Sequence, residues 1–174
     1  NRRFHAQPNA CPGCGPHVFF TDAKGNRLDS DPDDAVMLAS RYLKQGKIVA
    51  IKGIGGFHLA CDASNNEAVK NLRRRKKRPH KPFALMARSA SVLFEHVKLS
   101  PKEKERLKSY HRPIVLLEKK DPFQKELEGL ASDIAPFNTC LGVMLPYTPL
   151  HYLLLEKGPK ILIMTSGNRS GEPL

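Results

Sequence analysis

The sequence predicts an α/β domain with a twisted, mixed and largely parallel sheet against which helices pack. Helix and strand signals alternate along the chain from Ser30 onward, and this alternation is typical of α/β folds. Hydrophobic residues make up 40% of the 174 residues and charged residues 26%. That balance indicates a globular chain and excludes global disorder.

The expected elements follow in chain order. Asp31 is a predicted helix N-cap and Gly46 a predicted end of the same helix, because these residue types favour those positions. Ser100 and Glu103 have the spacing of a capping box, which predicts the start of another helix. Further helices are expected at 67–75 and 149–156, and strands at 48–51, 83–86, 114–117, 141–145 and 161–164. Residues 118–140 are expected to be mostly loop.

A cluster of cations is the first indication of function. Lys and Arg number 29 against 17 Asp and Glu, which gives a net charge of +12. Residues 73–78 are six consecutive cations, Lys81 adds a seventh, and Pro79 and Pro82 restrict the backbone between them. A focused basic segment favours an anionic partner such as a nucleotide, a phosphorylated substrate or nucleic acid. The alternative interpretation is a solvated helix end.

Two glycine-containing segments follow expected strands. Residues 52–58 (KGIGGFH) place Lys52 and His58 around glycines that let a backbone approach a ligand closely. This loop is neither a P-loop nor a dinucleotide-binding GxGxxG motif. Ser166 and Asn168 come after the last expected strand, and ligands of open α/β sheets bind beyond the carboxyl ends of strands. Each segment could equally be an ordinary turn.

The cysteines predict a metal half-site. Cys11 and Cys14 form a CPGC turn, which can present two thiolates to one zinc ion, although an unmetallated pair of surface thiols is the alternative. Cys61 and Cys140 are expected to be small core residues. The chain has no apolar run of membrane-spanning length and no signal-peptide pattern. We therefore expect a cytoplasmic protein that does not span a membrane.

Several motifs then resemble, in order, a known family. Residues 2–16 look like the end of the second zinc-finger-like module of the hydrogenase maturation carbamoyltransferases, the HypF family. Four further segments resemble the YrdC-like domain of that family, namely 52–62, 75–86, 141–151 and 165–173. The resemblance implies a zinc-finger half at 1–20 and a YrdC-like nucleotide-binding domain at 21–174. It also implies a fragment truncated at its C-terminal end, which need not be active alone.

The resemblance also implies a reaction. Members of the family convert carbamoyl phosphate and ATP to carbamoyl adenylate and transfer the carbamoyl group to HypE during [NiFe]-hydrogenase maturation. In the wider YrdC family a KxR pattern and an SxN pattern bind ATP, with magnesium expected beside the triphosphate. On this chain, KxR matches Lys76 and Arg78, with Lys81 as a further cation, and SxN matches Ser166 and Asn168. Lys52 and His58 match the substrate loop and are expected near the carbamoyl group.

Other functions remain open at this point. The basic surface could bind double-stranded RNA or tRNA, or the chain could be a threonylcarbamoyl-adenylate synthase-type domain for tRNA modification. A third hypothesis is a purely structural, zinc-linked interdomain piece. Residues 52–55 (KGIG) replace the Pro-Thr-Glu type loop of threonylcarbamoyl relatives, which favours carbamate. No Ser/His/Asp set has a recognisable spacing, so catalysis is expected to rest on positioning and charge stabilisation.

Overall fold

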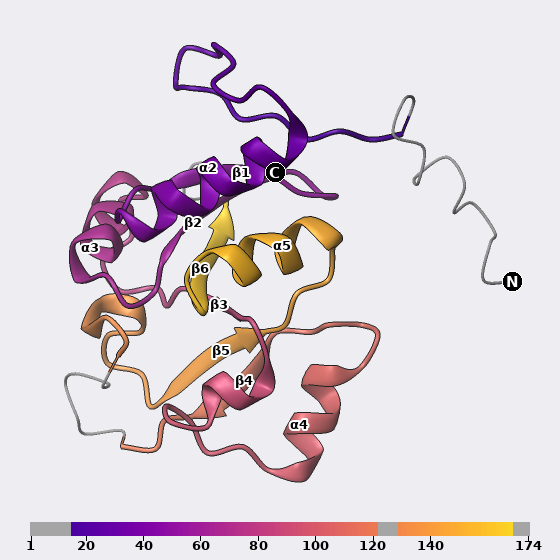
Figure 1. Cartoon of the computed structure of the whole chain (residues 1–174). Coiled ribbons are helices and arrows are strands. Elements are labelled where there is room, and N and C mark those ends of the chain that lie inside the picture. Colours follow the sequence, from indigo (N-terminus) through magenta and orange to yellow (C-terminus); the bar gives the residue numbers. More distant parts are fainter. Residues whose placement is uncertain (1–14, 122–128, 169–174) are drawn as a thin grey trace, which may run out of the picture.

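The computed structural model describes residues 15–121 and 129–168. Its described strands form a six-stranded sheet in the order β1-β2-β6-β3-β5-β4 (Figure 1). The strands are β1 (Val49–Lys52), β2 (Phe57–Asp62), β3 (Leu85–Ala87), β4 (Val115–Glu118), β5 (Cys140–Met144) and β6 (Ile161–Ser166). The helices are α2 (Pro32–Lys44), α3 (Asn66–Arg75), α4 (Pro101–Lys108) and α5 (Pro149–Lys157), with short 3-10 turns η1 (Ala90–Leu93) and η2 (Ser132–Ile134).

The α/β class is confirmed, but the expected predominance of parallel strands is wrong. Among the described strands, only β3 and β5 pair in parallel, and the other four pairings are antiparallel. The main cause is β2, which was not expected. The loop at 53–56 is too short for a crossover, so β1 and β2 must form an antiparallel hairpin. β2 then pairs antiparallel with β6, which lies in the middle of the sheet.

The sheet carries an apolar cluster on each face. Helices α2 and α5 pack together over one face (Figure 1), where Leu43 and Leu155 are buried with Met164 of β6. Helix α3 covers the other face, where Val69 and Leu72 join the larger cluster. Successive residues of a strand point to opposite faces, so β6 contributes to both clusters. β6 therefore lies between the two apolar clusters, and its carboxyl end comes out between α3 on one face and α5 on the other.

The expected helix caps are present. The Asp31 side chain accepts from the Asp34 backbone amide at the start of α2. Ser100 and Glu103 make both hydrogen bonds of a capping box at the start of α4. Each such cap stabilises a helix by about 1 kcal/mol. Of the two expected core cysteines, Cys61 is fully buried and Cys140 is half-buried. Burial raises the pKa of Cys61 to about 12, as expected for an inert core thiol.

In the ranges 15–121 and 129–168, no helix combines the length and apolarity needed to cross a membrane. Cys11 and Cys14 lie outside these ranges, so the zinc half-site stays a prediction.

Candidate functional site

The carboxyl end of β6 is joined to the end of α3 by Lys76. The Lys76 ammonium donates to the backbone carbonyl oxygen of Ser166 at 2.9 Å and also to that of Asn168. Lys76 is only 8% exposed, and its burial together with the nearby Arg78 lowers its pKa. An ammonium has three donors, so two of them are used by these carbonyls and the third has no acceptor among the residues that the structure describes. The first cation of the expected KxR pair is therefore in contact with the expected SxN segment.

Arg78 reaches the same strand end. Its Nη1 donates to Thr165 Oγ1 at 3.1 Å and its Nη2 donates to the Pro82 carbonyl at 2.8 Å. The guanidinium carbon lies 5.1 Å from the centroid of the Phe83 ring. Burial lowers the pKa of Arg78, and its buried Nε–H has no protein partner among the described residues. Arg78 is thus held by two hydrogen bonds, and its Nε–H is a buried donor with no acceptor in the described part of the chain.

The second arm of the site comes from the β1–β2 hairpin. His58 lies directly opposite Ser166 in the antiparallel pairing of β2 and β6, so both side chains share the face covered by α5. Lys52 pairs with Phe57 in the hairpin, and its ammonium lies 5.2 Å from the Phe57 ring centroid. Thr165 precedes Ser166 and therefore faces the other side of the sheet. The expected residues meet at the end of the sheet where β6 finishes, and their side chains come from both faces of the sheet.

Within the expected SxN segment, the Ser166 hydroxyl donates to Asn168 Oδ1 at 2.5 Å. The backbone between them is held by Gly167, whose amide donates to the Phe57 carbonyl at 2.6 Å. A Cβ at Gly167 would lie 2.9 Å from Phe57 Cβ. A glycine is therefore required where β6 leaves the sheet beside β2.

Lys81, the least secure of the predicted cations, is exposed. Its link to the neighbouring structure is through its backbone carbonyl, which accepts from Arg73 Nη1 at 3.2 Å. The structure therefore brings six of the predicted residues to one end of the sheet, namely Lys52, His58, Lys76, Arg78, Ser166 and Asn168. Among the described residues, the Lys81 side chain makes no hydrogen bond or ion pair at this site.

Arg73 and His151 are two residues of this region to which the sequence interpretation assigned no separate role. Arg73 is a hub for the turn that carries Arg78, since its guanidinium donates to the carbonyls of Pro79 at 3.1 Å and Asp133 at 3.1 Å among others. His151 of α5 lies with its ring centroid 6.5 Å from that of His58. Helical spacing in the sequence could have distinguished Arg73 from the exposed cations beside it. Arg73 falls on the same face of α3 as the buried residues Val69 and Leu72.

Buried polar atoms without a protein partner concentrate around this site. Five such side-chain atoms occur in the described part of the chain, and four of them belong to His58, Arg78 and His151. The remaining atom is Ser40 Oγ on α2. Native proteins pair the great majority of buried polar atoms. Four of the five unpartnered atoms lie around the carboxyl end of β6, which indicates that this end of the sheet binds a polar ligand.

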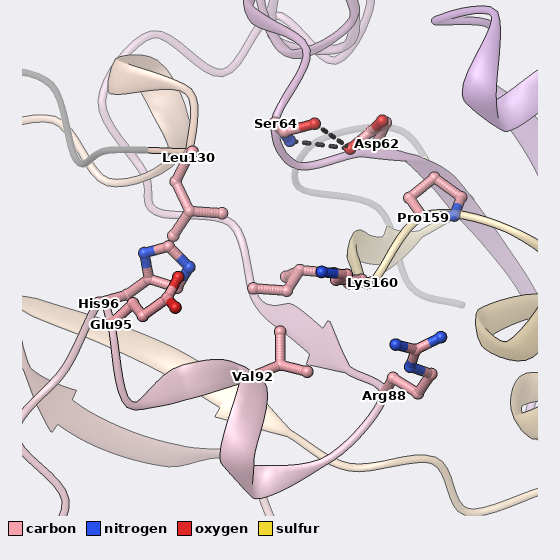
Figure 2. Close-up of a pocket in the computed structure, with 11 residues that line it drawn as sticks. Asp62, Ser64, Arg88, Val92, Glu95, His96, Leu130, Pro159 and Lys160 are labelled. Atoms are coloured by element: carbon pink, nitrogen blue, oxygen red, sulfur yellow. Dashed lines mark hydrogen bonds between the residues drawn. The ribbon is translucent and has the colours of Figure 1, made fainter.

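The surface has two hollows, one beside Arg78 and one away from the candidate site. One of about 300 Å³ is lined by Arg78 with four other cations, Lys70, Arg73, Arg74 and Lys77, and by Pro79 and Asp133. A larger one of about 600 Å³ lies at the opposite end of β6, beside Asp62, Arg88, His96 and Lys160 (Figure 2). The larger hollow contains none of the predicted site residues. No group of three or more potential metal ligands occurs in the part of the chain that the structure describes.

The glycine loop offers a direct test of how His58 is held. A Cβ at Gly53 would lie 2.8 Å from His58 Nδ1, whereas one at Gly55 would meet nothing within 4 Å. We expect Gly53→Ala to displace the His58 ring and to lower the free energy of unfolding by about 1–2 kcal/mol. Gly55→Ala, the matched control, is expected to have little effect. Chemical denaturation of both variants checks this, and equal stabilities would show that the loop does not pack on His58.

Comparisons with known proteins match nearly the whole chain to known families. The family model for Sua5, YciO and YrdC proteins, described as Telomere recombination, matches residues 41–174, and a HypF finger model matches residues 1–21. The chain is 51% identical over 173 residues to the carbamoyltransferase HypF of Rhodobacter capsulatus, covering 99% of this chain and 22% of that protein. The chain thus spans about a fifth of the length of this relative.

Solved structures of HypF proteins have the same fold as this chain. A crystal structure of full-length HypF in a phosphate- and nucleotide-bound form superposes with a TM-score of 0.85 at 50% identity, over 100% of this chain and 22% of that one. HypF from T. kodakarensis superposes with a TM-score of 0.87 at 45% identity, with the same coverage. These matches confirm the resemblance that the sequence motifs indicated.

Proposed function

Because the chain belongs to the Sua5/YciO/YrdC family over residues 41–174, we propose that it carries the ATP-dependent, adenylate-forming step of a hydrogenase-maturation carbamoyltransferase. Two similar proteins support this. The relative from R. capsulatus is named a carbamoyltransferase, and the related full-length structure is described as phosphate- and nucleotide-bound. Carbamoyl phosphate, ATP with its magnesium, and HypE as carbamoyl acceptor are the substrates and partner of this proposal.

One observation of the structure carries the proposal. Cations from the end of α3 and small polar groups from the end of β6 meet there, and the buried Nε–H of Arg78 has no acceptor within residues 15–121 and 129–168. Arg78 Nε–H and the third N–H of Lys76 are suited to phosphate oxygens, which accept charge-assisted hydrogen bonds. Lys76 also fixes the backbone at Ser166 and Asn168. A triphosphate bound here would lie beside backbone that the same cation has already ordered.

In the proposed step, water first hydrolyses carbamoyl phosphate to carbamate and inorganic phosphate, and a carbamate oxygen then attacks the α-phosphorus of ATP. A carbamate O–P bond forms, the bridging bond between the α- and β-phosphates breaks, and its electron pair leaves with pyrophosphate. Lys76 and Arg78 offset negative charge on the phosphates, and the rigid hold on Arg78 by Thr165 and Pro82 reduces the cost of ordering it. The carbamoyl group of the adenylate is then available for transfer to the acceptor.

The test is ATP binding by calorimetry in the full chain. We expect Arg78→Met, which keeps the side-chain length but removes the charge, to weaken ATP binding by about 10- to 100-fold. Arg75→Met is the matched control, because Arg75 is an exposed cation at the end of α3, three residues before Arg78, and the ATP affinity of this variant should stay within about twofold of wild type. Equal affinities of the Arg78 and Arg75 variants would remove Arg78 from the nucleotide site.

A further inference from the structure

The hollow of about 600 Å³ lies at the amino end of β6, at the opposite end of that strand from the proposed nucleotide site (Figure 2). Strand β6 runs antiparallel to both of its neighbours, so the carboxyl ends of β2 and β3 flank its first residues. These strand ends bring Asp62, Arg88 and Lys160 to the hollow, and residues of the segment 92–96 form another wall. A hollow of this volume is in the range of small-molecule binding sites.

The charged residues around this hollow are balanced, although the chain as a whole has a net charge of +12. They are two cations, Arg88 and Lys160, and two carboxylates, Asp62 and Glu95. Within residues 15–121 and 129–168, none of the four makes an ion pair. The backbone amide of Arg88 donates to the backbone carbonyl of Lys160 at 2.9 Å, which keeps the two cationic residues adjacent. The hollow therefore presents charges of both signs that do not neutralise one another.

The two signs of charge reach the hollow from different sides. Figure 2 shows Arg88 at the lower right and Glu95 at the left, with the Lys160 side chain reaching into the space between them. Part of the lining is apolar and includes Leu130 and Ile161, each of which is only 6% exposed. Small-molecule sites commonly combine such apolar walls with a few placed polar groups. The lining suits a molecule that has charged ends and an apolar middle.

His96 adds an uncharged polar group to the lining. Its residue is 6% exposed, and its ring has no hydrogen bond to any residue that the structure describes. Burial lowers the pKa of His96, so the ring is neutral at pH 7 and keeps one nitrogen as an acceptor. Proteins pair most polar groups that they bury. A nearly buried imidazole that lines a hollow and has no protein partner indicates that the hollow binds a polar ligand.

The balance of charge distinguishes this hollow from the smaller one beside Arg78. The smaller hollow is lined by five cations and one carboxylate, a composition that favours a polyanion. In the larger hollow, Asp62 and Glu95 would repel a triphosphate, and Arg88 and Lys160 would repel a polyamine. A molecule with one negative and one positive group has favourable interactions with both pairs of residues.

We propose that the larger hollow binds a dipolar small molecule, with a carboxylate at one end, an ammonium at the other and aliphatic carbons between them. The carboxylate lies between Arg88 and Lys160. The ammonium donates to the Glu95 carboxylate and to the acceptor nitrogen of His96, and the aliphatic carbons pack on Leu130. This site goes beyond the proposed adenylate-forming function and does not depend on it.

The test compares three probes of equal carbon-chain length. ε-Aminocaproate carries both charges, caproate only the carboxylate, and hexylamine only the ammonium. In the full chain, ¹⁵N NMR should show that ε-aminocaproate shifts the His96 ring nitrogens with a Kd of about 1 mM or tighter, while the exposed His17 is unchanged. Each single-charge probe should bind at least about 10-fold more weakly. Equal binding of a single-charge probe, or unchanged His96 nitrogens with ε-aminocaproate, would overturn the proposal.

Matched substitutions test each end of the site. Arg88→Gln and Glu95→Gln should each weaken the binding of ε-aminocaproate by about 10-fold, because each removes the charge that one end of the probe contacts. Lys102→Gln and Glu105→Gln on α4 are the controls, since both residues are exposed and do not line the hollow. The controls should keep the Kd within about twofold of wild type. An equal loss in the controls would show that only the overall charge of the protein matters, and the proposed contacts would be wrong.

A competition experiment separates this site from the nucleotide site. The two sites lie at opposite ends of β6 (Ile161–Ser166), so a saturating non-hydrolysable ATP analogue should change the Kd of ε-aminocaproate by less than about twofold. Displacement of ε-aminocaproate by the analogue would mean that the probe occupies the nucleotide site, which would overturn the proposal. Failure of the analogue to bind, with ε-aminocaproate still bound, would contradict the proposed adenylate-forming function alone.

Discussion

Replacing Arg73 with methionine is expected to lower the free energy of unfolding by about 3 kcal/mol and to weaken ATP binding as well. The Arg73 guanidinium donates to five backbone carbonyls, those of Arg78, Pro79, Lys81, Asp133 and Ile134. It also lies 4.7 Å from the centroid of the Phe83 ring, over which Arg78 lies too. Without it, the turn that carries Arg78 loses the side-chain hydrogen bonds to η2 and keeps the backbone bond from Phe83 to Ile134. Urea denaturation and ATP calorimetry of the same variant measure the two effects.

The adjacent Arg74 provides the control. Arg74 is exposed and donates to the Asn71 side chain on the helix surface at 2.8 Å, so Arg74→Met should change stability by less than about 0.5 kcal/mol. Arg73→Lys keeps the charge but cannot reach five carbonyls at once, and it should recover little of the loss. If the lysine variant were as stable as wild type, charge alone rather than the hydrogen-bonded clamp would explain the role of Arg73.

The cation run shows what the sequence could and could not predict. Composition and spacing correctly identified a proline-bounded basic segment between a helix and a strand. They treated its members as equivalent, whereas the structure divides them. Arg73 and Lys76 continue the buried face of Val69 and Leu72 on α3, at helical spacing of three and four residues. Arg74, Arg75 and Lys77 are exposed. The helical period was available in the sequence, but the carbonyl acceptors come from residues 133 and 134, some 60 positions away.

The sheet shows that strand positions can be predicted from the sequence more readily than strand pairing. Most strand positions were predictable from short apolar runs, and so were the caps of α2 and α4. Strand β2 was not, because the polar residues His58 and Asp62 leave it only a short apolar run, and the apolar Phe57 at its start is exposed. Strand direction depends on which segments pair, and β6 pairs with β2 and β3, which are far from it in sequence. The contact of His151 with His58 could not be predicted for the same reason, since the two residues lie on different elements.

The second large effect is a dependence of stability on pH that comes from His151. Its pKa is about 4 in the folded chain, lowered from 6.5 by burial and by His58. Between these values the unfolded chain binds more protons than the folded chain, so unfolding becomes easier as the pH falls. The full stabilisation is present above pH 6.5 and is lost progressively as the pH falls toward 4. A shift of this size corresponds to about 3 kcal/mol.

The contribution of His151 can be isolated by difference. Burial also lowers the pKa of His96, which adds to the acid sensitivity in the same direction. Subtracting the unfolding free energies of His151→Gln from those of wild type, at each pH between 4 and 7.5, cancels the His96 contribution. The difference should change by about 3 kcal/mol across that range and be flat above pH 7. A difference that is flat throughout would mean that the pKa of His151 is the same in the folded and unfolded chains, and that the imidazole does not lie buried and neutral against His58.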